Sequence, residues 1–172
     1  MPVLACPRRQ PLEVLVSSFW KGKKVLVTGH TGFKGSWLSL WLQQAGADVV
    51  GYALAPPTDP SLFEVARVGE GMTSIEADVR DLECLRAVVA EHRPEVVLHL
   101  AAQAIVRASY DDPIETYSTN VMGTVNLLEA IRLEPAVRAG VIVTRDKCHD
   151  SPELERGHVE EAALGGRDPY SN

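Results

Sequence analysis

The stretch Val27–Gly35, VTGHTGFKG, places three glycines at intervals of three residues. The apolar run before it, ending in KVLV, is typical of a buried strand. The segment after it repeats apolar residues at helical spacing (Trp37, Leu38, Trp41 and Leu42). This stretch is therefore predicted to be the turn between a first strand and a first helix.

A glycine-rich turn in that position has a physical purpose. Gly29 permits a tight turn, Gly32 lets the backbone approach a pyrophosphate, and Gly35 lets the helix pack closely on the strand. The free N–H groups and positive dipole at the start of the helix then hold the anion. The pattern alone is weak, but the strand before it and the helix after it favour dinucleotide binding over a structural turn.

The rest of the chain continues the alternation of strands and helices. Further strands are predicted at residues 47–54, 72–78, 95–102 and 139–144, and helices at 61–68, 81–92 and 112–133. Asp81 is expected to cap one helix, and Pro113 to occupy the first turn of another. The rhythm predicts an α/β fold: a Rossmann-type, doubly wound parallel sheet that stops after about the fifth strand.

Composition excludes several classes of protein. The 172 residues carry a net charge of −6 and no basic stripe, which argues against a nucleic-acid partner. No apolar run approaches the roughly 20 residues that span a bilayer. The three cysteines have no metal-like spacing, so no metal site is expected, and reduced thiols indicate a cytoplasmic protein. Residues 1–18 are interpreted as a disordered leader or a start codon assigned too early, and residues 19–172 as the dinucleotide-binding domain.

Several phrases resemble one family closely. GxxGxxG, ADVRD, HLAAQ and TNVMGT follow one another as in the extended short-chain dehydrogenase/reductase superfamily. FWKGKKVLVTGHTGFKGSWLSLWL, GYALAPPTDPSLFE, YSTNVMGT, DKC and DPYSN are similar to the CDP-glucose 4,6-dehydratases within it. The likeness covers residues 19 to 172, nearly everything beyond the leader.

The resemblance implies NAD as the cofactor and a set of contacts to it. The glycine loop would hold the pyrophosphate, residues after the third strand would meet the adenine, and residues after the fourth and fifth strands would line the remainder. The implied cofactor-binding residues are Gly29, Thr31, Gly32, Phe33, Lys34, Gly35, Asp78, Val79, Leu100, Ala101, Ala102, Gln103, Thr119 and Thr144. The second strand lacks the acidic residue expected for the adenosine ribose, and no arginine stands ready for a 2′-phosphate, so NAD is preferred over NADP rather than deduced.

The resemblance also implies a reaction. In this family NAD takes hydride from C4 of CDP-glucose, water is eliminated across C5 and C6, and the hydride returns to C6 of the 4-keto-6-deoxy product. Tyr170 would take the C4 hydroxyl proton, while Asp146 and Lys147 would serve the elimination. The full-length family often forms homodimers.

Two departures from the family pattern predict that this chain is inactive. Where the family has Thr-Ser-Asp-Lys-Cys-Tyr, the chain reads Thr-Arg145-Asp-Lys-Cys-His, so the serine that bonds the reacting hydroxyl is replaced by a cation. The lysine four residues after the tyrosine would fall beyond Asn172, and the substrate-binding region would be absent. Three interpretations stay open: a truncated dehydratase, an NAD-binding half-domain with a partner chain, or a related epimerase or dehydratase.

Overall fold

Five parallel strands form the centre of the computed structural model, which describes residues 18–145, 148–150 and 159–171. Their order is β3-β2-β1-β4-β5, so the chain starts in the middle of the sheet, winds to one edge and then crosses to the other. The strands are β1 (Lys24–Thr28), β2 (Asp48–Ala53), β3 (Thr73–Glu76), β4 (Val96–His99) and β5 (Ala139–Ile142). In register, Lys24 lies opposite Asp48 on β2, and Val25 lies opposite Val96 on β4. The predicted doubly wound parallel sheet is confirmed.

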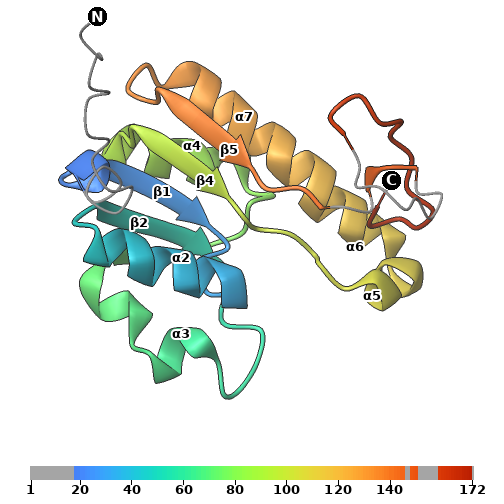
Figure 1. The fold of residues 1–172 in the computed structure, drawn as a ribbon, viewed down its shortest axis with the longest axis horizontal. Coiled ribbons are helices and arrows are strands. Elements are labelled where there is room, and N and C mark those ends of the chain that lie inside the picture. Colours follow the sequence, from blue (N-terminus) through green and yellow to red (C-terminus); the bar gives the residue numbers. More distant parts are fainter. Residues whose placement is uncertain (1–17, 146–147, 151–158, 172) are drawn as a thin grey trace, which may run out of the picture.

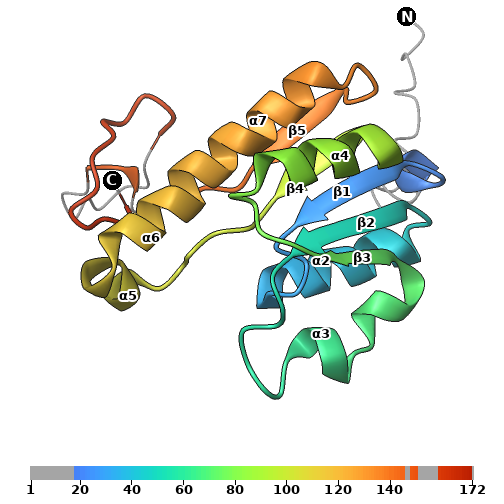
Figure 2. The same ribbon diagram turned by 180° about the vertical axis from the view of Figure 1, so that it is seen from behind.

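Helices cover both faces of this sheet (Figures 1 and 2). One face carries α2 (Phe33–Gln44), and α3 (Leu62–Val65) with the 3-10 turn η1 (Val68–Gly71) packs beside it. The other face carries α4 (Leu82–His92) and α7 (Gly123–Leu133), which pack against each other. The strands are near-continuous apolar runs because they are buried on both sides.

Each face has its own apolar core. Leu26, Val50 and Val97 point toward α4 and α7, where they meet Leu85 and Leu127. Val25, Val27, Val49 and Val96 point the other way, toward Leu42 of α2. Alternate residues of one strand thus stabilise opposite layers.

The long helix predicted over residues 112–133 forms in three parts. It begins as α6 (Pro113–Tyr117), passes through a π-helical turn, η2 (Ser118–Met122), and continues as α7. Pro113 occupies the first turn as expected, and the Asp112 carboxylate caps it by accepting the Glu115 N–H at 2.9 Å. A further short helix, α5 (Val106–Asp111), was not predicted, because its sequence VRASYD has no clear apolar face.

No helix among the described residues is both long enough and apolar enough to cross a bilayer. Residues 1–17, which hold almost all of the predicted leader, lie outside the described part.

The cap of α4 gives a direct test of the helix assignment. The Asp81 side chain accepts the Cys84 N–H at 3.0 Å. Asp81→Ala is expected to lower the free energy of unfolding by about 1 kcal/mol, because one N–H at the helix start loses its acceptor. Asp81→Asn keeps an acceptor and should stay close to the native value in urea unfolding. Equal losses in both variants would show that the cap contributes nothing.

Candidate functional site

A cleft of about 230 Å³ opens at the carboxyl ends of the strands, between the turns that follow β1, β2, β3 and β4. This is where ligands bind in open α/β sheets, at the point where the strand order reverses. The lining residues are Gly29, Thr31, Gly32, Ala53, Leu54, Ala55, Pro57, Ala77, Asp78, Val79, Leu100, Ala101, Ala102 and Thr119. Its walls are mostly apolar, and Asp78 is the single charged residue among them.

The first and third glycines of the loop are required by packing within the protein. Gly29 has φ +75°, and a Cβ there would lie 2.7 Å from the Ala101 nitrogen. A Cβ on Gly35 would lie 2.0 Å from the Gly29 carbonyl oxygen. Both positions therefore exclude any side chain, because backbone segments touch there.

Gly32 is different, because the protein leaves room for a side chain. Its φ is −75° and ψ is 166°, which any residue adopts, and the nearest atom to an added Cβ would be 3.4 Å away. Gly32 lines the cleft, so a Cβ there would occupy space that a ligand needs. The residues thus fit a pyrophosphate that approaches the backbone at Gly32.

The start of α2 suits an anion. Gly32 is the N-cap residue, no side chain caps the helix, and its first turn has no acidic residue. The backbone N–H groups of the first turn and the positive end of the helix dipole are therefore available to a bound anion. Lys34 stands in that turn.

A buried polar network fixes the cleft wall behind Ala101. The Thr28 hydroxyl accepts the N–H groups of Leu100 and Ala101, each at 3.2 Å, so its own hydrogen points to His99 Nδ1 at 2.6 Å. His99 therefore carries its proton on Nε2, which donates to the Thr124 hydroxyl at 3.1 Å. Thr124 in turn donates to the Asn120 carbonyl at 2.6 Å. The network joins β1, β4 and the helix that starts at Pro113.

Asn120 holds the next part of the same wall. Its side-chain Oδ1 accepts the Gln103 N–H at 2.8 Å, and its Nδ2 donates to the Gln103 carbonyl at 3.1 Å. Asn120 lies in the π-helical turn, where Thr119 lines the cleft. Of these two successive residues, Asn120 therefore fixes the wall and Thr119 faces the cleft.

His30 fills the space under the glycine loop. It is fully buried, its Nε2 lies 2.7 Å from the Ser74 hydroxyl, and its ring meets Phe63 edge-on at 5.3 Å. A Cβ on Gly51 would lie 2.4 Å from this ring. Burial lowers the pKa of His30 to about 4, and burial lowers the pKa of His99 to about 4 as well. Both histidines are therefore neutral at pH 7.

The structure brings together nine of the fourteen residues predicted to hold the cofactor: Gly29, Thr31, Gly32, Asp78, Val79, Leu100, Ala101, Ala102 and Thr119. Phe33, Lys34 and Gly35 form the adjoining first turn of α2 instead of lining the cleft. Gln103 stands beside the wall, with its side chain bound to Ile105 and Thr116, and Thr144 is an exposed residue after β5. Leu54, Ala55 and Pro57 line the cleft but were not predicted, because apolar loop residues give no motif.

The predicted catalytic residues are only partly described. Asp146 and Lys147 lie outside the described residues. Tyr170 is described, and the Arg145 guanidinium lies over its ring, 3.9 Å from the centroid. Arg145 Nε and Nη1 are buried and have no hydrogen-bond partner among the residues that the structure describes.

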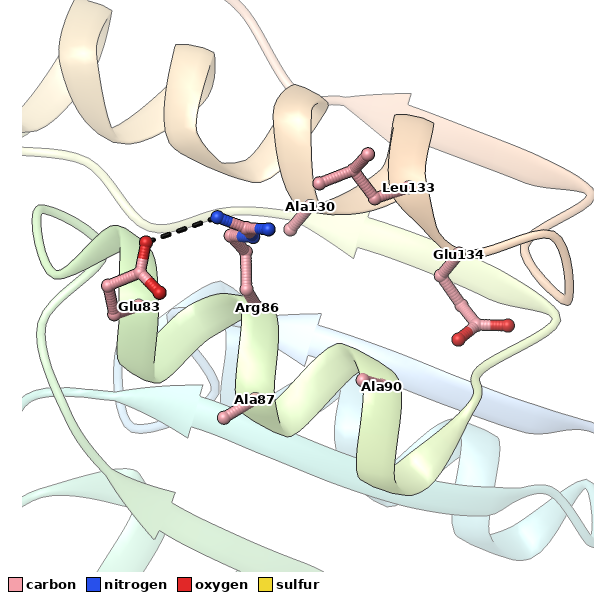
Figure 3. A pocket seen from close by; sticks show the side chains of 7 residues that line it. All are labelled: Glu83, Arg86, Ala87, Ala90, Ala130, Leu133 and Glu134. Carbon is pink, nitrogen blue, oxygen red and sulfur yellow. Dashed lines mark hydrogen bonds and ion pairs between the residues drawn. The ribbon is translucent and has the colours of Figure 1, made fainter.

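A second cavity, of about 300 Å³, lies between α4 and α7 (Figure 3). Ala87, Ala90 and Ala130 line it, and a surface pair of Glu83 and Arg86 flanks it. It has neither a glycine loop nor a free helix start, so it lacks the features that bind a dinucleotide. Within the ranges that the structure describes, no three histidine, cysteine or acidic side chains gather as a metal site would need.

The sequence is similar to those of known sugar-nucleotide enzymes. A model of the GDP-mannose 4,6 dehydratase family matches residues 26–171. CDP-glucose 4,6-dehydratase of Salmonella typhimurium is 58% identical over 155 residues, which are 90% of this chain and 43% of the relative. The chain therefore spans less than half of that relative's length.

Solved structures show the same arrangement. UDP-glucose 4-epimerase of Stenotrophomonas maltophila, solved with bound NAD and formylated UDP-arabinopyranose, superposes with a TM-score of 0.76 at 29% identity. It is matched over 87% of this chain and 44% of its own. UDP-glucose 4-epimerase of Thermus thermophilus in complex with NAD gives a TM-score of 0.73 at 33% identity, over 86% of this chain and 46% of its own.

The two buried histidines predict how stability depends on pH. Their folded-state pKa values lie below the unfolded value of about 6.5, so the folded state favours the neutral form. Their contribution is complete above about pH 6.5 and falls as the pH drops toward 4, by at most about 1.4 kcal/mol per pH unit for each histidine. Urea unfolding between pH 7 and pH 5, above most carboxyl titrations, should show this loss.

Substituting one histidine tests the cause. His30→Asn should flatten the slope of unfolding free energy against pH. A slope identical in the native chain and in His30→Asn would rule out His30 as its source.

Proposed function

Because the chain belongs to the GDP-mannose 4,6 dehydratase family and is similar to a CDP-glucose 4,6-dehydratase, we propose that it supplies the NAD-binding part of a nucleotide-sugar dehydratase. The proposed reaction converts CDP-glucose to CDP-4-keto-6-deoxyglucose. The main support for the proposal is the cleft. The start of α2, which no side chain caps, lies there together with a glycine that packing does not require and a single carboxylate.

The residues of the cleft divide into three parts that match a dinucleotide. The pyrophosphate would lie at Gly32 and the first turn of α2, where N–H groups and Lys34 supply positive charge. The adenine would lie beside Asp78 and Val79. The nicotinamide half would lie along Leu100 to Ala102 and Thr119, and the polar network behind this wall keeps it rigid.

The cleft favours NAD over NADP. The residues at the end of β2, where the adenosine ribose would lie, are Leu54, Ala55 and Pro57, and none of the cleft-lining residues is basic. A 2′-phosphate there would meet apolar groups and the Asp78 carboxylate, so it would lose solvation without gaining a partner. The unphosphorylated ribose avoids this cost.

NAD would carry the hydride in the proposed reaction. Tyr170 would receive the proton of the C4 hydroxyl, and Asp146 with Lys147 would move protons during the elimination of water. Arg145 stacks on the Tyr170 ring and replaces the serine of related sequences, so it holds the ring in place and adds positive charge beside it. These roles are proposals for this chain.

The choice of cofactor is testable by calorimetry. The purified chain is expected to bind NAD at least about tenfold more tightly than NADP, because a buried phosphate without a cation costs more than about 1.4 kcal/mol. Tighter binding of NADP would contradict the assignment of the neutral ribose site.

Gly32 provides a sharper test of the cleft. Gly32→Ala should keep the native unfolding free energy, because the protein leaves room for the methyl group, and should lose NAD binding at least about tenfold, because that methyl displaces the pyrophosphate. Gly35→Ala should instead destabilise the fold, since its Cβ overlaps the Gly29 carbonyl. A Gly32→Ala chain that binds NAD normally would place the cofactor elsewhere.

The reaction itself is tested by incubating the protein with NAD and CDP-glucose and following the sugar by NMR. Because Arg145 replaces the serine of related sequences, this chain is expected to give no product. A 4-keto-6-deoxy product that carries the C4 hydrogen at C6 would support the dehydratase and contradict the predicted inactivity. Conversion to the C4 epimer without loss of water would instead indicate an epimerase.

A further inference from the structure

The Arg80 side chain joins two walls of the cleft. Asp78 lines the cleft after β3, and its carboxylate accepts three N–H groups of Arg80: the backbone N–H at 2.9 Å, Nε at 2.9 and 3.0 Å, and Nη2. The remaining nitrogen, Nη1, forms an ion pair with Glu115 on α6. The Glu115 carboxylate also accepts the Thr119 hydroxyl at 3.5 Å, and Thr119 lines the other side of the cleft.

The backbone of the same turn is attached to the helix beyond. Asn126 Nδ2 donates to the carbonyls of Val79 and Arg80 at 3.1 and 3.0 Å. The Val79 side chain fits against Gly123, where an added Cβ would lie 2.7 Å from Val79 Cγ2. The turn is therefore fixed without Arg80, and what Arg80 adds is the orientation of the Asp78 carboxylate.

This arrangement gives Asp78 a defined chemical character. Hydrogen bonds from Arg80 lower the pKa of Asp78, so its carboxylate is ionised and its oxygens only accept hydrogen bonds. The three guanidinium nitrogens of Arg80 bind Asp78 and Glu115, so the group is directed toward these two carboxylates. A base that donates from an amino group would gain a hydrogen bond at such a carboxylate, and one with a carbonyl at the same position would be repelled.

The ion pairs of Arg80 with Asp78 and Glu115 contribute little to the stability of the fold. The side chains of Arg80, Asp78 and Glu115 are 37, 27 and 44% exposed, and ion pairs at that exposure stabilise a fold only weakly. Loss of Arg80 should thus leave a folded protein with a misplaced acceptor.

We propose that Arg80 is a positioning residue: through Asp78 and Glu115 it sets the acceptor that selects an amino-substituted purine at the adenine end of the cleft. The inference rests on the proposed cofactor function. It assigns the selectivity for the base to a residue that itself lies outside the cleft lining.

The test compares NAD with nicotinamide hypoxanthine dinucleotide, which carries a carbonyl oxygen in place of the adenine amino group. Calorimetry on the native chain should show weaker binding of the hypoxanthine compound. Arg80→Gln should lose about fivefold in affinity for NAD and little for the hypoxanthine compound, so that the ratio of the two falls toward one. A purely structural defect would weaken both equally.

Three further variants keep the test decisive. Arg80→Lys retains the charge without the fork and should recover part of the ratio. Arg86→Gln removes a surface arginine that pairs with Glu83 at 3.1 Å beside the α4–α7 cavity, and it should change nothing (Figure 3). Glu115→Gln weakens the contact at the far end of Arg80 and should also lower the ratio, which supplies the test if Arg80→Gln does not fold.

An NMR titration reads the same interaction without ligand. The Asp78 carboxyl should titrate at higher pH in Arg80→Gln than in the native chain, because its main hydrogen-bond donor is gone. An unchanged ratio in folded Arg80→Gln would overturn the role of Arg80 alone. A native chain that binds neither dinucleotide would overturn the proposed cofactor function and this inference with it.

Discussion

The contact of backbone on backbone at Gly29 is the constraint on which the rest of the site depends. The turn after β1 passes so close to the start of the Leu100–Ala102 segment that a single methyl group on Gly29 would overlap the Ala101 backbone. The same turn is pressed against the first turn of α2 at Gly35. These two contacts bring the helix start, the end of β1 and the end of β4 to one point, and the cleft exists because they converge there.

Polar groups then make that point rigid. Thr28 binds two backbone N–H groups of the opposing wall, and His99 and Thr124 carry the connection to the long helix. Asn120 holds Gln103 from the π-helical turn. Buried polar networks of this kind are stable only when each member has its hydrogen-bond partners. The side-chain donors of Thr28 and His99 both have an acceptor in this network. The walls are therefore organised before any ligand arrives.

Much of this was predictable from the sequence. The five strands, the glycine loop and the Asp81 cap were expected because local patterns determine them: apolar runs, glycine spacing and capping residues. Most of the nine cleft residues were expected only because the sequence resembles the dehydratase family. The helix α5 was missed because VRASYD has no apolar period. The tautomer of His99 and the contacts of Arg80 with Asp78 and Glu115 were also missed, since they depend on residues far apart in the sequence that only the fold brings together. The π-helical turn at Ser118–Met122 was missed because no local pattern indicates it.

A crystal structure of the chain with NAD would test the central claim most directly. The account predicts the pyrophosphate at Gly32 and the first turn of α2, with the adenine beside Asp78 and the nicotinamide along Ala101. A dinucleotide bound in the cavity between α4 and α7, or one whose phosphates lie away from α2, would contradict it.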